Sequence, residues 1–267
     1  MEIVSLKYHF INATMTIRFS VITCTLNSAK FLGQTLHSLS KQEDRDFEHI
    51  FVDGGSTDNT LQMINELTGN VRLIQNITGG ISRAMNVGIE AAHGEIILHL
   101  HSDDYLAHPK VLSRVNVCFN APTCEWLYGR TLTDYDGRWT PEVPHFHPYS
   151  YSRLLKGNII PHPATFVRRS VFKRLGLFNE NLRYAMDYDM WLRVGSLINP
   201  IQVREFFSVF RAHAGSMTYA NKLDSFTEDH MVRRSHLQKS PLHRFAHEIR
   251  YLKRKWELER LLANSTD

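Results

Sequence analysis

Cysteine and long apolar runs are both scarce in this sequence. The 267 residues include three cysteines, Cys24, Cys118 and Cys124, and no CxxC pair. An odd and small number of thiols argues against a disulfide framework and favours a reduced, cytoplasmic protein. No stretch approaches the roughly 20 apolar residues that a membrane-spanning helix needs. Residues 1–15 also lack a clear apolar core and a cleavage site, so we do not expect a signal peptide.

Zinc motifs are absent as well. The chain has 15 histidines, but none follows the HExxH spacing and no cluster of cysteine and histidine occurs. Structural zinc sites need four such ligands at short spacings. The sequence therefore predicts no structural zinc site.

Charge is modest overall and uneven along the chain. The formal net charge is +4, yet basic residues far outnumber acidic ones between Met231 and Arg260. Apolar residues recur near helical spacing in the same segment: Leu242, Phe245, Ile249, Leu252, Trp256 and Leu261. Such a helix either lies on an anionic membrane surface or packs on the main domain or a partner subunit, and the sequence leaves both open.

Strands and helices alternate four times in the first part of the chain. "RFSVITCTLN" predicts a buried strand over Phe19–Cys24, and "FEHIFVD" a second one that ends at Asp53. "VRLIQN" and "EIILHLH" predict two more, and the helix of "GGISRAMNVGIEAAHG" is expected to end with Gly94 as its C-cap. Continuous apolar strands separated by helices are typical of a parallel sheet covered on both faces. The predicted fold class is α/β, a mostly parallel central sheet with flanking helices (Rossmann-like), followed by a helical C-terminal tail.

Beyond residue 105 the pattern is looser. "CEWLYGRTLTDYDGRW" predicts an antiparallel pair of strands that turns at Asp136-Gly137. A short helix is expected near Tyr149–Lys156, a strand running into a helix in "TFVRRSVFKRLG", a helix in "DYDMWLRVGSL" and a strand in "QVREFFSVFRAH".

Polar side chains stand where the four early strands end. Ligands of parallel sheets bind beyond the carboxyl ends of the strands. Those ends carry Thr25, Asn27, Asp53, Gln75, Asn76, Asp103 and Asp104. We therefore expect these side chains to converge on one ligand site.

The adjacent carboxylates Asp103 and Asp104 are the most distinctive of these groups. Like charges side by side repel, and hard oxygen ligands of this kind suit Mg²⁺ or Mn²⁺, with phosphate oxygens completing the shell. Such a cation would neutralise a departing diphosphate. The alternative is a solvated turn in which one aspartate caps the next helix.

Several motifs in a fixed order resemble the nucleotide-sugar-binding half of family 2 glycosyltransferases with the A-type fold. The motifs are "SVITCTLNSAKFLGQTLHSLSKQ", "HIFVDGGSTDNT" and "RAMNVGIEAAHGEIILHLHSDD", with "DYDMWLRV" and "FRAHAGSMT" similar to later motifs of the family. The resemblance covers roughly residues 18–218. It implies a sugar transfer from a nucleoside diphosphate sugar, but says little about the particular sugar.

The resemblance assigns roles to the residues at the strand ends. Thr25 and Asn27 would lie beside the nucleotide, and Asp53 would bind the base. Asp103 would contact the ribose, and Asp104 would bind the metal ion. An ordinary turn aspartate is the alternative interpretation of Asp53.

The same resemblance extends to cations and to a histidine. Many relatives have an aspartate where this chain has Arg83, so we expect Arg83 to approach the diphosphate instead, since a guanidinium suits phosphate oxygens. Arg211 and His213 lie in a segment that folds over the diphosphate in relatives, and His213 is a candidate metal ligand. His101 and His162 are either neighbours of the ligand or packed imidazoles.

A second pair of carboxylates lies in "YAMDYDMWLRV". Asp187 and Asp189 would point about 200° apart on a helix, so they cannot share one role. Asp187 aligns with the general base of the family and Asp189 with a structural carboxylate. A helix N-cap is the alternative for Asp187.

The sequence thus predicts three segments and one leading function. The segments are an N-terminal extension (1–17), a glycosyltransferase domain (18–220, divided into a nucleotide-binding half, 18–105, and an acceptor half, 106–220) and a basic helical tail (221–267). The function is an inverting, metal-dependent transfer to a saccharide or lipid-linked acceptor in bacterial cell-surface polysaccharide synthesis. We expect a cytoplasmic protein, with contact at the inner face of the membrane through the tail and no nucleic-acid partner.

Two other functions compete with this prediction. A nucleotidyltransferase also uses acidic groups and a metal ion, but would normally have a glycine-rich loop with Arg and Lys after the first strand, where this chain has "TLNSAKFLG". The other is a non-catalytic nucleotide-sugar-binding protein, against which the presence of Asp53, Asp103, Asp104 and Asp187 argues.

Overall fold

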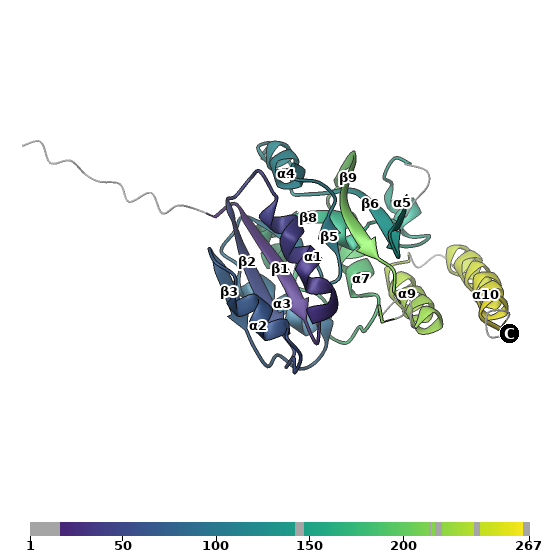
Figure 1. The fold of residues 1–267 in the computed structure, drawn as a ribbon. Helices are drawn as coiled ribbons and strands as arrows, with labels where there is room; N and C mark the ends of the chain where they lie inside the picture. Colours follow the sequence, from purple (N-terminus) through teal and green to yellow (C-terminus); the bar gives the residue numbers. More distant parts are fainter. Residues whose placement is uncertain (1–16, 142–146, 214, 217–220, 238–240, 264–267) are drawn as a thin grey trace, which may run out of the picture.

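The computed structural model describes residues 17–141, 147–213, 215–216, 221–237 and 241–263 (Figure 1). The N-terminal extension expected at 1–17 lies outside the described residues except for Ile17.

The described elements alternate as the sequence predicts in the first half. The strands are β1 (Phe19–Thr25), β2 (Phe47–Asp53), β3 (Val71–Ile74), β4 (Ile96–His99), β5 (Tyr105–Leu106), β6 (Trp126–Tyr135), β7 (Arg138–Pro141), β8 (Thr165–Arg168) and β9 (Ile201–Arg211). The helices are α1 (Ala29–Ser40), α2 (Thr60–Asn65), α3 (Ile81–Ala91), α4 (Val111–Phe119), α5 (Tyr151–Leu154), the 3₁₀ helix η1 (His162–Ala164), α6 (Arg169–Leu175), α7 (Met186–Gly195), α9 (Lys222–His236) and α10 (Pro241–Ala263).

One mixed sheet organises these elements. Its order is β3-β2-β1-β4-β8-β6-β9-β5, with β7 paired to β6. The first four strands are mutually parallel, whereas β8 runs antiparallel to β4 and to β6. The expected hairpin is confirmed: β6 and β7 pair around Asp136 and Gly137, which both have positive φ. The predicted α/β fold class is confirmed.

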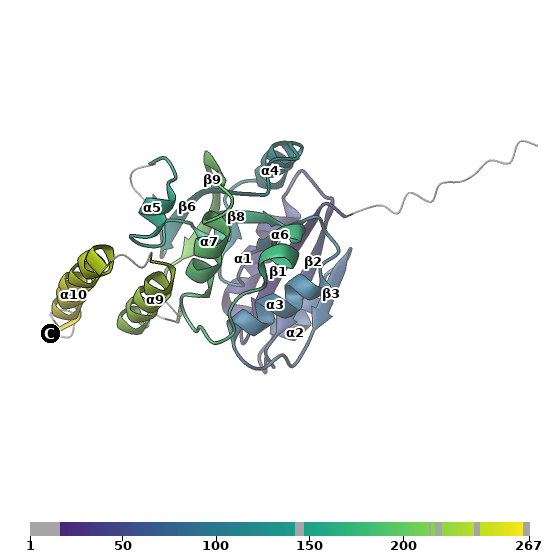
Figure 2. The same ribbon diagram turned by 180° about the vertical axis from the view of Figure 1, so that it is seen from behind.

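Helices cover both faces of the sheet (Figures 1 and 2). On one face, Ile22 and Val52 pack against α3, α6 and α7. On the other, Val21 and Leu98 pack against α1 and α4. Side chains of successive strand residues point to opposite faces, and this is why β1 and β4 read as continuous apolar runs. The burial of these apolar side chains is the main contribution to the stability of the fold.

The C-terminal helices lie beyond α7, at the end of the molecule far from β3 (Figures 1 and 2). α9 contacts α7, and α10 contacts α9. No helix in the described ranges has a stretch long and apolar enough to cross a bilayer.

The expected role of Gly94 is wrong. α3 ends earlier, with Ala92 as its C-cap in an extended conformation. Gly94 instead lies against the start of β1, where its N–H donates to Ser20 Oγ (2.8 Å) and to Glu48 Oε1 (3.1 Å). A Cβ atom at this position would lie 2.5 Å from the Ser20 nitrogen and 2.6 Å from the Phe19 carbonyl carbon. The glycine is therefore required by the close approach of two backbones.

We expect Gly94→Ala to destabilise the protein by about 1–3 kcal/mol, because the backbone of β1 would have to move. Gly33→Ala is the matched control: Gly33 is exposed in α1, and an added Cβ would meet Met63 at an ordinary 3.6 Å. That variant should gain up to about 1 kcal/mol from helix propensity. Denaturant unfolding measures both, and a Gly94→Ala protein as stable as wild type would contradict the packing argument.

Candidate active site

Asp53, the last residue of β2, has a carboxylate with no exposure to solvent. Its Oδ1 accepts hydrogen bonds from Thr25 Oγ1 (2.8 Å) and Ser56 Oγ (2.5 Å). Its Oδ2 accepts from the N–H groups of Gly55 and Ser56, each at 2.8 Å. Burial opposes ionisation, but these hydrogen bonds outweigh it and hold the pKa of Asp53 below its usual range. The ionised carboxylate therefore fixes the turn that follows β2. To bind the nucleobase, as the resemblance implies, Asp53 would have to give up one of these hydrogen bonds.

Asn27 is joined to the same turn from the end of β1. It has a φ of 50°, its N–H donates to Ser56 Oγ (2.9 Å), and its Oδ1 accepts from the N–H of Thr57 (2.9 Å). The structure thus brings Thr25, Asn27 and Asp53 together through Ser56, as the strand-end argument predicts.

Asp103 meets His213, which comes from the segment after β9. Asp103 Oδ2 lies 3.0 Å from His213 Nε2, and both side chains are about a quarter exposed, at 27% and 21%. His213 Nδ1 accepts the N–H of Gly215 (3.1 Å), and its ring lies 4.5 Å from that of Phe31. Since Nδ1 accepts, the proton of a neutral ring is on Nε2 and is donated to Asp103.

Asp104 has different surroundings from its neighbour. The residue is 2% exposed, and its Oδ1 accepts the backbone N–H of Arg211 (3.1 Å). The resemblance gives the metal ion to Asp104 and His213, and the carboxylate that lies beside the His213 ring is that of Asp103. Asp104 fixes the end of β9 beside the site.

Most donors of the Arg211 guanidinium are used within the protein. Its Nε donates to the carbonyl oxygen of Asp103 (3.2 Å), an Nη donates to Gln34, and the other lies 3.8 Å from Asp134. The guanidinium carbon also lies 4.8 Å from the centre of the Phe31 ring. Arg211 therefore ties the segment before His213 to α1 and the sheet.

Arg83 is placed differently. It is exposed in the first turn of α3, directly after two glycines with positive φ, Gly79 and Gly80. Its guanidinium has no hydrogen bond or ion pair with any other residue that the structure describes. A helix that follows a parallel strand starts at the carboxyl edge of the sheet, so this cation is available at the ligand edge.

Asp187 is at the start of α7. Its Oδ2 accepts a hydrogen bond from Asn158 Nδ2 (3.0 Å), and its Oδ1 accepts the N–H of Tyr188 (2.6 Å). Burial raises the pKa of Asp187 to about 6, against the effect of these two bonds. A carboxylate with a pKa near the working pH is suited to accept a proton from a hydroxyl group.

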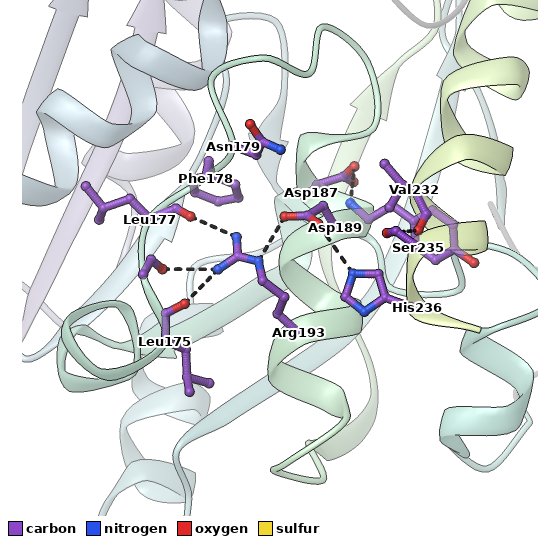
Figure 3. A network of polar contacts seen from close by, with 12 residues as sticks. Leu175, Leu177, Phe178, Asn179, Asp187, Asp189, Arg193, Val232, Ser235 and His236 are labelled. Atoms are coloured by element: carbon purple, nitrogen blue, oxygen red, sulfur yellow. Dashed lines mark hydrogen bonds and ion pairs between the residues drawn. The ribbon is translucent and has the colours of Figure 1, made fainter. Parts of the chain in front are cut away.

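Asp189 makes a separate set of contacts, as the helical spacing predicts (Figure 3). It lies 2.9 Å from Arg193 Nε and 3.4 Å from His236 Nε2, which comes from α9. The guanidinium of Arg193 also donates to the carbonyl oxygens of Leu175 and Leu177, both at 2.8 Å. Asp189 is thus a structural carboxylate that joins α7 to α9 and to the segment after α6.

Two acidic residues of α9 were not anticipated. Glu228 Oε2 accepts the consecutive N–H groups of Arg183 (3.1 Å), Tyr184 (2.5 Å) and Ala185 (2.7 Å). Ala185 is the N-cap of α7, and Glu228 of α9 accepts its N–H together with those of the two residues before it. We call this arrangement the Glu228 clamp.

Asp229 is the second of these residues. Burial, and then the charge of Asp187, raise the pKa of Asp229 to about 7, while Arg233 and Arg254 act in the opposite direction. Nothing in the sequence signals either role, because the contacts join residues more than 40 positions apart. Asn158, from the loop after α5, was missed because it lies 29 positions from Asp187 in the chain.

Three histidines form a packed group behind Asp103. The ring of His162 lies 5.6 Å from that of His99 and 5.1 Å from that of His101, centre to centre. Burial lowers the pKa of His99 to about 3, and it lowers those of His101 and His162. These rings are therefore neutral and packed, and the packed interpretation of His101 agrees with this geometry.

The side chains at the carboxyl edge of the sheet supply only part of the ligands that a metal ion needs. Within the described ranges, no three Asp, Glu, His or Cys side chains come together in a way that could hold a metal ion. Asp103 and His213 offer a carboxylate and an imidazole, a donor set that suits Mn²⁺ or Mg²⁺ when phosphate oxygens supply the remaining ligands. The side chains thus fit a cation that binds together with a diphosphate.

Sequence comparison identifies the family of the chain. The model of the family described as "Glycosyl transferase family 2" matches residues 20–176, and the chain belongs to this family. A "PGL/p-HBAD biosynthesis glycosyltransferase" of Mycobacterium bovis is 34% identical over 197 residues, which cover 72% of this chain and 74% of the relative. A chondroitin synthase of Pasteurella multocida is 30% identical over 218 residues, or 80% of this chain and 22% of that enzyme. The chain is thus a family 2 glycosyltransferase, which decides against a nucleotidyltransferase.

Solved structures share the fold. S. aureus TarS (residues 1–349), in complex with UDP-GlcNAc, has a TM-score of 0.69 at 23% identity, covering 90% of this chain and 73% of that one. The mannosyltransferase PcManGT from Pyrobaculum calidifontis, in complex with GDP-Man and Mn²⁺, has a TM-score of 0.61 at 18% identity, covering 86% and 69%. At these identities the likeness shows the fold alone.

We expect Asp229→Asn to stabilise the protein, and to do so more at pH 8 than at pH 4.5. The pKa of Asp229 is raised in the folded state, so the unfolded chain loses this proton at a lower pH than the folded protein does. The free energy of unfolding therefore falls as pH rises from about 4 to about 7. An asparagine has no such penalty. Thermal unfolding should show a Tm at least about 3 °C above wild type at pH 8 and a smaller gap at pH 4.5. A gap independent of pH would show that Asp229 titrates normally.

Proposed function

We propose that this enzyme transfers a sugar, with inversion at the anomeric carbon, from a nucleoside diphosphate sugar to a hydroxyl group of its acceptor. The observation that carries the proposal is Asp187: a half-buried carboxylate with a raised pKa at the start of α7, oriented by Asn158. A single base on the acceptor side is what a one-step displacement requires.

The donor side of the proposal rests on the carboxyl edge of β1, β2 and β4. Thr25, Asn27 and Asp53 form one connected turn there, and Arg83 offers phosphate oxygens a guanidinium that no other described residue binds. TarS and PcManGT share this fold and were solved with UDP-GlcNAc and GDP-Man. Those ligands support a nucleoside diphosphate sugar as donor. We propose that Asp53 acts by fixing the turn beside the base.

The proposed metal ion, Mg²⁺ or Mn²⁺, would be held by Asp103 and His213, while Asp104 positions the end of β9. PcManGT was solved with Mn²⁺, which supports a cation in this fold. When bound, the cation would neutralise the charge that develops on the leaving diphosphate. His213 would have to move its proton from Nε2 to Nδ1 and give up the hydrogen bond from Gly215 in order to become a ligand. Asp104, the metal ligand that the resemblance implies, is the less exposed alternative.

The chemical step assigned to the chain's own residues is a proton transfer. Asp187 Oδ accepts the proton of the acceptor hydroxyl while that oxygen forms its bond to the anomeric carbon. The bond between that carbon and the diphosphate oxygen breaks on the opposite side, and its electron pair leaves with the nucleoside diphosphate. Asn158 keeps one carboxylate oxygen in place during this step.

The acceptor is a saccharide or a lipid-linked compound in this proposal, and the reaction belongs to bacterial cell-surface polysaccharide or glycolipid synthesis. The Mycobacterium bovis relative is named for PGL/p-HBAD biosynthesis and the Pasteurella multocida relative for chondroitin. Cys24, Cys118 and Cys124 are all free thiols, which agrees with a cytoplasmic reaction.

We expect Asp187→Asn and Asp103→Asn to separate the two halves of the reaction. Asp187→Asn should lower kcat at least about 100-fold, because the base is lost, and leave donor affinity unchanged. Asp103→Asn should weaken donor binding in the presence of Mn²⁺. The measurements are nucleoside diphosphate release and thermal shift with a panel of nucleotide sugars, with and without Mn²⁺.

Asp224→Asn is the control, since Asp224 is an exposed carboxylate in the first turn of α9. If the wild-type protein binds no nucleotide sugar in the presence of Mn²⁺, the proposed donor is wrong. Equal loss of donor binding in the Asp187 and Asp103 variants would contradict the division of roles.

A further inference from the structure

A basic groove lies between α10 and the loop after α5. Its volume is about 470 Å³, and it is lined by Lys156, Ile249, Arg250, Lys253, Arg254 and Glu257, among others. Four of these side chains are cations and one is a carboxylate. None of the four cations forms an ion pair with another residue in the part of the chain that the structure describes. A concave surface with this surplus of positive charge is suited to an anion.

An apolar stripe runs along the same helix. Phe245, Ile249, Leu252 and Trp256 are 65%, 51%, 57% and 60% exposed. Their spacing of four, three and four residues places them on one face of α10. Ile249 belongs both to this stripe and to the groove, so apolar and basic surfaces are continuous.

The opposite face of α10 fixes the direction in which the stripe points. Tyr251 is 8% exposed, and its ring stacks on that of His230 in α9, with centres 3.8 Å apart. Glu248 lies 3.3 Å from His230 on the same side. One face of α10 thus packs on α9, and the stripe faces away from it.

The groove lies close to the proposed base. The carbonyl oxygen of Lys156 accepts a hydrogen bond from Arg233 of α9 (3.2 Å). Asn158, two residues further along the chain, binds Asp187. A ligand bound at Lys156 would therefore approach the acceptor side of the enzyme.

We propose that the basic groove and the apolar stripe form a binding site for a phosphate-bearing membrane lipid. The phosphate groups would lie among Lys156, Arg250 and Lys253, and the stripe would enter the bilayer surface beside them. An amphipathic helix with exposed aromatic and aliphatic residues next to cations is typical of helices that lie in an anionic membrane interface. A protein partner would need no such surplus of charge. The proposal favours a lipid-linked acceptor and, in that respect, rests on the proposed function.

Vesicle flotation tests the site without any sugar donor. The full chain is mixed with vesicles of phosphatidylcholine alone, or of phosphatidylcholine and phosphatidylglycerol in equal parts. We expect binding to the anionic vesicles and a blue shift of the fluorescence assigned to Trp256, which Trp256→Phe should remove. Arg250→Ala combined with Lys253→Ala should reduce the bound fraction at least about fivefold.

The matched control is Lys41→Ala combined with Lys173→Ala, two exposed cations outside the groove. It changes the net charge equally and should bind as wild type does. Equal losses in both double variants would show that binding follows net charge alone and would overturn the site. Inorganic phosphate should not displace the protein from vesicles at millimolar concentration; displacement would show a site for free phosphate instead.

Two further outcomes also count against the proposal. Wild-type protein that remains unbound in the presence of anionic vesicles would overturn it. A dimer in solution that Leu252→Glu converts to a monomer would assign the stripe to a second copy of the chain. These measurements use no sugar donor, so a protein that does not bind vesicles would contradict the lipid site but not the transfer reaction. A protein that binds vesicles but has no transferase activity would contradict only the proposed reaction.

Discussion

The carboxylate of Glu228 accepts three consecutive backbone N–H groups directly before α7, and the position of α7, with the proposed base Asp187, depends on this contact. The N–H groups at the start of a helix have no partners inside the helix, and the N–H of Ala185, the N-cap of α7, is one of the three that Glu228 binds. Without an acceptor from elsewhere, this end of α7 would have to be solvated or distorted. The Glu228 clamp supplies a charged acceptor and thereby fixes where Asp187 lies.

The packing of α9 on α7 extends this constraint. His236 of α9 lies 3.4 Å from Asp189 of α7, and Val232 packs in the core. Arg233 of α9 donates a hydrogen bond to the carbonyl oxygen of Lys156. The loop with Lys156 also carries Asn158, the hydrogen-bond donor to Asp187. The segment after residue 220 was expected to be a tail, and its division from the catalytic domain remains a prediction. Its first helix, α9, contacts the surroundings of Asp187 at several points. The donor side has a comparable arrangement in Asp53, whose four hydrogen bonds hold the turn beside Asn27.

Local features of the fold could be predicted from the sequence, because local chemistry determines them. The early strands follow from continuous apolar runs, and the β6–β7 turn follows from Asp136 and Gly137, which tolerate positive φ. The C-cap at Gly94 was wrong, because that glycine is required by a contact with β1 and has no part in ending the helix. From the ends of the strands, Asp103 and Asp104 were expected to lie at the ligand edge of the sheet. Which of them meets His213 could not be predicted, since the direction of each side chain depends on the backbone after β4. Glu228 and Asn158 escaped prediction because their partners are distant in the chain.

The most direct test of this account is the Glu228→Gln variant, assayed for both turnover and donor affinity. Glutamine keeps the shape of the side chain but removes the charge that three N–H groups share. If the clamp positions Asp187, kcat should fall at least about tenfold while the Kd for the nucleotide sugar stays within about twofold of wild type. An unchanged kcat would contradict the account, and so would a loss of kcat and donor binding in equal proportion.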